Sequence, residues 1–346
     1  MNKMKTIWVI GLLISIAAFG VLACRKSADV QLPDYLVFEV PNGWPMPTYP
    51  FQENPLTEQG FELGKKLFHD KRFSVDNSIS CGDCHMQHEG FTHNDHGLAH
   101  GVNNQSSTRN PPGLINLAWR NSFNWDGRFT KLDDQPIHPI TAPNEMGETM
   151  GNILKKLRDD PDYPILFLQA FGSKNISEKH ILQALSQYML QIVSYNSKYD
   201  QVKRGEASFT LSEQLGYEIF QHKCVSCHKE PFFTDFTFRN IGMPIDPGLK
   251  DIGRMSVTGN REDSLRFMVP SLRNVQLTFP YGHDGRFPTL INVFDHYSNR
   301  VVQAPGTDAL VRNRISLTPF EMGQLQSFLF TLTDSTVLQN PRLRHH

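Results

Sequence analysis

The stretch CGDCHMQHEGFTHNDHGLAHG, Cys81 to Gly101, gathers two cysteines and five histidines in twenty-one residues. Thiolate and imidazole groups are common ligands of transition metals, so this stretch predicts a metal centre. Its first five residues follow the pattern CxxCH, and the same pattern returns in CVSCH, Cys224 to His228. The two motifs use four of the five cysteines, and the fifth is Cys24, so no pair is left for a structural disulfide.

The CxxCH pattern favours covalently bound haem. Its two thiols can add to the vinyl groups of the porphyrin, and the histidine that follows can ligate the iron from the proximal side. We therefore predict two haem c groups, attached through Cys81, Cys84, Cys224 and Cys227, with His85 and His228 as iron ligands. A zinc ribbon built from the four cysteines is the alternative, but it does not explain why a histidine follows each pair.

The surroundings of the two motifs are also repeated. LGKKLF (63–68) precedes the first motif, and LGYEIF (215–220) precedes the second. PGLINLAWRNSFNWDGRFTKL follows the first and PSLRNVQLTFPYGHDGRFPTL the second, with ten residues from Asn116 to Asp126 and ten from Asn274 to Asp284. Equal order and equal spacing predict an internal duplication.

Apolar residues recur at helical spacing in both halves, whereas strand-type alternation is scarce. Thr57 and Ser212 are the expected N-caps of the helices that lead to the two motifs. Further helices are expected over 178–200 and from Pro319, the latter capped by Thr318. The expected fold is mostly α, with two loop-rich helical domains divided near 201–209.

The N-terminus predicts export. Lys3 and Lys5 precede the apolar run IWVIGLLISIAAFGVLA, which ends at Cys24 and is typical of a secretory signal. The ending VLAC resembles a lipoprotein signal, so residues 1–23 would be removed and Cys24 would carry lipid that holds the protein at a membrane. A transmembrane anchor is the alternative. Six prolines between Asp29 and Pro55 then predict an extended tether over 24–55.

With 34 basic and 35 acidic residues, the chain gives no indication of a nucleic-acid partner. The segments FNWDGRFTKLDDQPIHPITAPNEM (123–146) and VPSLRNVQLTFPYGHDGRFPTL (269–290) resemble the signature segments of bacterial di-haem cytochrome c peroxidases and their MauG-like relatives. The resemblance runs from about 51 to 333. It implies two tandem cytochrome c-like domains, an N-terminal peroxidatic one at 56–203 and a C-terminal electron-transfer one at 204–335, followed by a tail at 336–346.

The resemblance also implies an activity and partners. The family reaction is the reduction of hydrogen peroxide to water. The electrons come from a small cytochrome or cupredoxin and pass from the C-terminal haem to the N-terminal one. We expect a location in the cell envelope or periplasm, and family members are commonly homodimers.

Peroxide cleavage needs a proton shuttle and a dipole that polarises the O–O bond. Alignment of the halves on their DGRF motifs places Gln135 opposite Val293 and Glu145 opposite Gln303. Only the first half therefore offers an acid beside an amide. The resemblance assigns the same catalytic roles to Gln135 and Glu145, with Glu145 as the proton shuttle.

The resemblance implies two further sites between the halves. Trp125 matches the family tryptophan that assists electron transfer between the haems, although an ordinary buried tryptophan is the alternative. Asn110, Thr278 and Pro280 match the positions that hold a calcium ion between the domains in relatives.

The second iron departs from the best-known peroxidases, which place a methionine opposite the proximal histidine. Tyr297, in FDHYSNR, stands at that position, as in MauG-like members, and phenolate ligation favours ferric iron. The alternative is a packing tyrosine, with Met243 or Met255 as the ligand. Tyr297 also leaves open a MauG-like oxidase that acts on a protein or organic substrate. Gln135 and Glu145 disfavour a third possibility, a di-haem electron carrier without catalysis.

The remaining histidines of the opening stretch could reach the other face of the first iron. His88 is too near to His85 for this, since its extended chain spans only about 10 Å. His93, His96 and His100 have the reach, and AHG stands where relatives place a detachable distal histidine. We therefore predict that His100 closes the first iron in the oxidised protein and leaves when the second haem is reduced. The alternative is a loop of solvated histidines over a permanently open iron.

Overall fold

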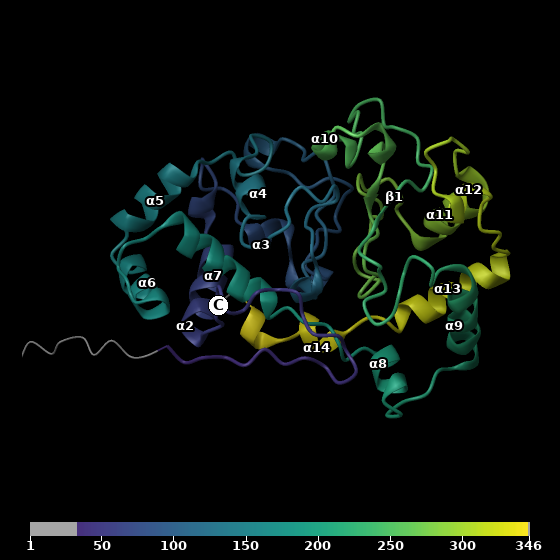
Figure 1. The fold of residues 1–346 in the computed structure, drawn as a ribbon, viewed down its shortest axis with the longest axis horizontal. Helices are drawn as coiled ribbons and strands as arrows, with labels where there is room; N and C mark the ends of the chain where they lie inside the picture. Colours follow the sequence, from purple (N-terminus) through teal and green to yellow (C-terminus); the bar gives the residue numbers. More distant parts are fainter. Residues whose placement is uncertain (1–32, 345–346) are drawn as a thin grey trace, which may run out of the picture. The chain divides into compact units, whose positions relative to one another are not determined.

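The computed structural model describes residues 33–344, and this part of the chain is mostly helical (Figure 1). Two short strands, β1 (Phe238–Arg239) and β2 (Phe267–Met268), form one antiparallel pair. The predicted mostly α fold is therefore confirmed. Within residues 33–344 no helix is both long and apolar enough to cross a membrane. The predicted signal peptide and Cys24 lie outside the described residues.

The first half of the chain and the part that follows it each contain several short helices. Those of the first half are α2 (Glu58–Phe68), α3 (Cys81–Cys84), α4 (Ile137–Thr141), α5 (Met150–Asp159), α6 (Tyr163–Phe171) and α7 (Glu178–Leu190). Those that follow are α8 (Lys198–Lys203), α9 (Leu211–Lys223), α10 (Met255–Thr258), α11 (Leu290–Asp295), α12 (Ala309–Arg312), α13 (Pro319–Phe330) and α14 (Ser335–Leu338). Single 3₁₀ turns lie at Lys71–Phe73, Gln87–Glu89, Val102–Asn104, Leu117–Trp119, Arg261–Asp263 and Pro341–Leu343, and one π turn, η6, at His296–Arg300.

Each half is built around one close helix crossing. Helix α2 packs on α7, and α9 packs on α13 (Figure 1). A glycine permits both contacts: a Cβ on Gly64 would lie 1.9 Å from the carbonyl oxygen of Ala184, and one on Gly216 would lie 2.0 Å from that of Gln324. These glycines belong to the repeated LGKKLF and LGYEIF segments, so the repeat preserves the crossing.

A repeated asparagine also holds the same position in each half. Asn116 and Asn274 both have positive φ, 57° and 59°. The backbone N–H of Asn116 donates to the Ile192 carbonyl at 2.9 Å, and the backbone N–H of Asn274 donates to the Leu332 carbonyl at 3.0 Å. Two hydrophobic clusters, one in each half, form the core. Residues 33 onward nevertheless form one unit by their contacts, and the domain boundary near 201–209 stays a prediction.

The predicted N-caps are mostly confirmed. Thr57 caps α2, and Thr318 caps α13 with Glu321 in a capping box. The prediction of Ser212 is wrong, because α9 begins two residues earlier and is capped by Thr210. Thr210 forms a capping box with Glu213, which satisfies donors at both ends of the first turn, and Ser212 becomes part of that turn.

The helix predicted over 178–200 is interrupted. Helix α7 ends at Leu190, and α8 begins at Lys198. Between them the backbone forms tertiary hydrogen bonds instead of helical ones: the Ser194 amide donates to Asn116 Oδ1, and the amides of Tyr195 and Asn196 donate to Asp334 Oδ2, all at 2.9 Å. These partners are distant in the chain, so the local apolar periodicity did not indicate the break.

The expected tether and tail both pack on the body in the parts that the structure describes. Residues 33–55 contain no helix, as expected, but Trp119 Nε1 donates to the Pro45 carbonyl at 2.8 Å. The Thr48 amide also donates to the Ala118 carbonyl, at 2.9 Å. At the other end Val337, Leu338 and Leu343 are buried in the core of the first half. Neither segment is therefore free along its described length.

Candidate functional site

The two CxxCH motifs have the same local geometry. His85 Nδ1 lies 2.9 Å from the Phe91 carbonyl oxygen, and His228 Nδ1 lies 3.0 Å from that of Phe233. A bond from Nδ1–H to a carbonyl fixes the tautomer and leaves Nε2 free to ligate a metal. Burial also lowers the pKa of His85 to about 4, so its imidazole is neutral, as a ligand must be.

The four cysteines of the motifs form no disulfide with one another. Burial raises the pKa of Cys81, Cys84 and Cys224 to about 12, so these thiols are protonated at neutral pH. Each motif thus presents two partly buried thiols and one oriented imidazole, which is the donor set of haem c. Among the described residues no group of three or more His, Cys, Asp or Glu side chains is arranged to hold a metal ion.

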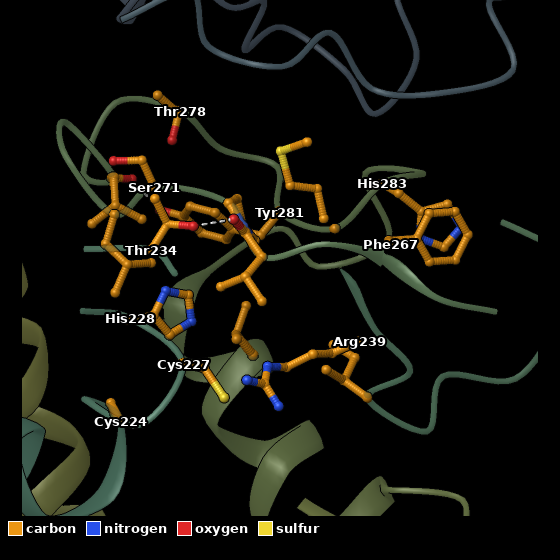
Figure 2. Close-up of a pocket in the computed structure, with 18 of the residues that line it drawn as sticks. Cys224, Cys227, His228, Thr234, Arg239, Phe267, Ser271, Thr278, Tyr281 and His283 are labelled. Atoms are coloured by element: carbon orange, nitrogen blue, oxygen red, sulfur yellow. Dashed lines mark hydrogen bonds between the residues drawn. The ribbon is translucent and has the colours of Figure 1, made fainter. Parts of the chain in front are cut away.

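A cavity of about 260 Å³ opens beside the second motif. Figure 2 shows His228 above Cys224 and Cys227, with Arg239 beside them. Its apolar wall includes Phe220, Leu290, Phe294, Leu325 and Leu329. The thiols, the imidazole and the apolar lining together fit a covalently held haem.

Tyr297 lines this cavity, as the predicted sixth ligand of the second iron would have to. It lies in the π turn η6, a distortion that is often found at functional sites. Burial, together with the nearby Cys224 and Cys227, raises its pKa above the usual value. Met243 lines the same cavity, whereas Met255 does not, so Met243 is the alternative ligand that stays open.

The first half carries Glu145 near its own motif. Burial raises the pKa of Glu145, although Arg128 and Arg109 oppose the effect. The carboxyl is close enough to Cys84 to contribute, after burial, to the raised pKa of that thiol. Gln135 Nε2 donates to Asn124 Oδ1 at 3.0 Å, which ties the amide to the residue before Trp125.

The counterparts in the second half lack this chemistry. Val293 lines the cavity with an apolar side chain, and Gln303 is exposed. The aligned positions therefore hold a glutamine and a glutamate in the first half, and an apolar side chain and an exposed amide in the second.

Trp125 connects the two halves. Its Nε1 donates to the Asn110 carbonyl at 2.8 Å, and its own carbonyl accepts from the Met268 amide, in β2, at 2.8 Å. The side chain lines the cavity of the second motif. The position therefore suits a residue between two redox centres.

Of the three residues matched to a calcium site, Asn110 and Pro280 are in direct contact. Asn110 Nδ2 donates to the Pro280 carbonyl at 2.6 Å, and its Oδ1 is buried without a hydrogen-bond partner in the described structure. Thr278 lies next to Gly90. A Cβ added to Gly90 would lie 2.9 Å from the methyl group of Thr278. The unpartnered oxygen is the feature that fits a cation.

The histidine loop runs between the two halves. The ring centroids of His93 and His96 are 4.5 Å apart, and those of His96 and His100 are also 4.5 Å apart. His93 is buried, whereas His100 is exposed. Gly101 lies against the backbone of Glu145, so His100 is carried close to the predicted proton shuttle.

An ion-pair network between the halves had no signal in the sequence. Arg109 Nη1 lies 2.6 Å from Asp126 Oδ2, and its Nε lies 2.6 Å from Asp251 Oδ2. Asp126 belongs to the first DGRF motif, and Asp251 lies in a loop of the second half. Only the fold brings these loops together, because 142 residues separate Arg109 from Asp251.

Comparison with known proteins agrees with this geometry. Residues 58–208 match the model of the family described as di-haem cytochrome c peroxidase. The methylamine utilization protein MauG of Methylophilus methylotrophus is 32% identical over 318 residues, which cover 90% of this chain and 92% of that protein. The chain belongs to the di-haem cytochrome c peroxidase family. It is thus an oxidoreductase of the peroxidase type, and the family carries two haem c groups.

The di-haem cytochrome c peroxidase family includes both peroxidases and MauG proteins. The cytochrome c551 peroxidase of Nitrosomonas europaea is 34% identical over 278 residues, 79% of each chain. A crystal structure of a MauG-like protein associated with microbial copper homeostasis has a TM-score of 0.83 and 31% identity, and the match covers 89% of this chain and 99% of that one. These similarities establish the family and leave the choice between the two activities to the site.

Proposed function

We propose that this protein reduces hydrogen peroxide to water with electrons from a small redox protein, passed from the C-terminal haem to the N-terminal one. The observation that carries the proposal is Glu145, a largely desolvated carboxyl with a raised pKa beside the first CxxCH motif. The second half has only the exposed Gln303 at the aligned position. An electron carrier without catalysis would need no such acid.

The side chains that would hold the two haem groups are those of the CxxCH motifs. Cys81, Cys84 and His85 would hold the first, and Cys224, Cys227 and His228 the second, with Tyr297 as the further ligand of the second iron. When bound, the haem groups supply the iron that takes up peroxide and the centres that store electrons.

Glu145 would move the proton in this proposal. Its raised pKa brings the carboxyl nearer to neutral pH, so it can accept a proton from one peroxide oxygen and return it to the other. Gln135 would orient the substrate through its amide, which Asn124 holds in place.

Trp125 would carry electrons between the halves. Its indole is fixed on one side by the Asn110 carbonyl, and its backbone is bonded to β2 of the second half. A tryptophan that is held by both halves keeps a constant position relative to each, which electron transfer requires.

We further propose a calcium ion at Asn110, Thr278 and Pro280. The buried Oδ1 of Asn110 lacks a partner, and the Pro280 carbonyl lies beside the same amide. Oxygen atoms from the two halves are suitable ligands for calcium. Removal of calcium by a chelator should lower peroxide turnover, and added calcium should restore it; equal rates throughout would exclude the site.

The surroundings of the protein belong to the same proposal. The signal-like N-terminus supports a location in the cell envelope or periplasm, with a lipid on Cys24 as membrane anchor. The donor would be a small cytochrome or cupredoxin, and the protein would form a homodimer. These statements rest on the sequence and on the family.

A MauG-like oxidase is the second candidate, and Tyr297 favours it. A tyrosine that lines the second cavity supports a low-potential haem, which suits the oxidation of a protein or organic substrate better than storage of an electron. A direct comparison separates the two. Rapid peroxide consumption with a reduced cytochrome supports the peroxidase, whereas slow consumption coupled to oxidation of an added substrate supports the oxidase.

A further inference from the structure

Three arginines line the cavity of the second motif, and two of them are paired with carboxylates. Arg239 Nη2 lies 2.7 Å from Asp235 Oδ2, and its Nη1 lies 2.9 Å from Asp308 Oδ2. Arg273 donates two hydrogen bonds to Asp200, at 2.9 and 2.8 Å. The third is Arg120.

Arg120 has no carboxylate partner among the described residues. Its Nη2 donates to the sulfur of Met268 at 2.8 Å, and its Nε is buried without any partner. Burial lowers the pKa of Arg120 to about 10. A thioether is a weak acceptor, so this guanidinium is desolvated without compensation. A buried cation of this kind requires an anionic ligand.

The cavity itself indicates which anion is available. Cys224 and Cys227 determine where the vinyl edge of a haem c lies, and the two propionates project from the opposite edge of the macrocycle. Figure 2 shows Arg239 beside Cys227, whereas Arg120 lines the same cavity with its guanidinium against the Met268 sulfur of β2. The propionates are the anionic groups that a haem c would bring to Arg120 in this cavity.

We propose that Arg120 binds a propionate of the haem c attached to Cys224 and Cys227. A guanidinium can hold a carboxylate with two parallel hydrogen bonds. An unpaired propionate is a negative charge near the second iron and favours the ferric state. Pairing with Arg120 neutralises that charge. Arg120 would thus raise the potential of a haem that Tyr297 lowers. The proposal rests on the C-terminal haem and is independent of which substrate is turned over.

The test uses the full-length protein with both haem groups attached and compares Arg120→Gln with Arg120→Lys. In Arg120→Gln the ferric to ferrous equilibrium of the C-terminal haem should shift toward ferric by about tenfold, or about 59 mV for one electron. The resonance Raman band from propionate bending of that haem should move as well. Arg120→Lys keeps the charge but loses the two-bond geometry, so it should move the band with a smaller change in potential.

Arg312→Gln is the matched control, because this exposed arginine of the same half contacts only backbone carbonyls. It should change neither the potential nor the band. His228→Gly, which removes the proximal ligand of the C-terminal haem, assigns the signals of the two haem groups. An unchanged band in both Arg120 variants would overturn the proposal, as would a change confined to the N-terminal haem. Absence of peroxide turnover in the parent, with the band shifted in the Arg120 variants, would count against the proposed function and leave this proposal standing.

Discussion

At the scale of single residues, a few substitutions distinguish two halves that the duplication makes alike. The histidines of both CxxCH motifs have the same Nδ1 contact with a backbone carbonyl oxygen, at 2.9 and 3.0 Å. The two copies differ at the predicted distal positions. Gln135 in the first half aligns with Val293 in the second, and Glu145 aligns with Gln303. The functional asymmetry of the protein is therefore expected to follow from these positions.

The substitution Glu145→Gln should leave both haem groups attached and lower peroxide turnover by roughly 100-fold or more, because it removes the positioned proton shuttle. Since burial raises the pKa of Glu145, the parent should lose activity on acidification at a pH above the usual glutamate value of about 4.3, as the base becomes protonated. The variant should lack this acidic limb. Steady-state rates from pH 4 to 8 test both statements.

The surface variant Glu206→Gln is the control, since Glu206 pairs only with Arg204 at the surface. It should retain the parent rate and the parent pH profile. Equal turnover by Glu145→Gln and the parent would remove Glu145 from the mechanism.

The substitution Tyr297→Phe should change the spectrum of the C-terminal haem and leave that of the N-terminal haem as it is. The reason is that Tyr297 lines the second cavity, and the change deletes only its hydroxyl group. Optical and electron paramagnetic resonance spectra of the ferric protein measure the effect. Tyr281→Phe is the matched control, because Tyr281 lines the same cavity but donates its hydroxyl to the Val275 carbonyl at 2.9 Å. Identical spectra for Tyr297→Phe and the parent would favour Met243 or an open site.

At the scale of elements, the helix crossings hold each half together. The crossing of α9 and α13 depends on Gly216, because a Cβ there would lie 2.0 Å from the backbone oxygen of Gln324. Backbone atoms of a packed helix cannot yield as a flexible side chain can, so any larger residue must force the two helices apart.

We expect Gly216→Ala to lower the free energy of unfolding by about 1–3 kcal/mol, the usual cost of overpacking. Denaturant titration of the protein with its haem attached, followed by circular dichroism, measures it. Gly323→Ala on α13 is the control, because its added Cβ meets nothing within 4 Å. Alanine is the better helix former, so this variant should gain up to about 1 kcal/mol. A Gly216→Ala protein as stable as the parent would show that the crossing is not tightly packed.

At the scale of the whole molecule, loops connect the halves in addition to helix α14, which packs on the first half. Arg109 pairs with Asp126 of the first half and Asp251 of the second. The backbones of Gly97, in the histidine loop, and Gly285, in the second DGRF motif, are in contact, since a Cβ on Gly285 would lie 2.3 Å from the Gly97 oxygen. The loop that carries His100 therefore touches the second half at Gly97 and the backbone of Glu145 at Gly101.

This placement suits the predicted switch at His100. In the fully oxidised parent His100 should close the first iron, and reduction of the second haem should release it. His100→Gly should then show a high-spin first haem that reacts with peroxide before any reduction, as measured by electron paramagnetic resonance and stopped-flow absorption. If the all-ferric parent already behaves in this way, the first iron is permanently open and no switch exists.

The intact mature protein should contain two covalent haem groups and a lipid. The haem groups account for Cys81, Cys84, Cys224 and Cys227, and the lipid accounts for Cys24. Mass spectrometry of protein from a host that matures c-type cytochromes should find both additions. Fewer than two haem groups, or zinc in their place, would contradict the prediction.

The sequence by itself determined the cofactor motifs, the duplication and the mostly α fold, because each depends on residues that are close together in the chain. The roles of Gln135 and Glu145 stay a prediction from the same sequence. CxxCH, a capping threonine or a glycine at a helix crossing acts over a few positions, and a duplicated sequence repeats that local information.

Only the tertiary structure decided where α7 stops, that the described parts of the proline-rich and C-terminal segments pack on the body, and that Arg120 has no carboxylate partner within residues 33–344. The break after Leu190 depends on bonds from Ser194 to Asn116 and from Asn196 to Asp334, which no local pattern contains. Burial and charge pairing are properties of segments that meet in space. A sequence states which charges exist, and the fold determines which of them are left without a partner.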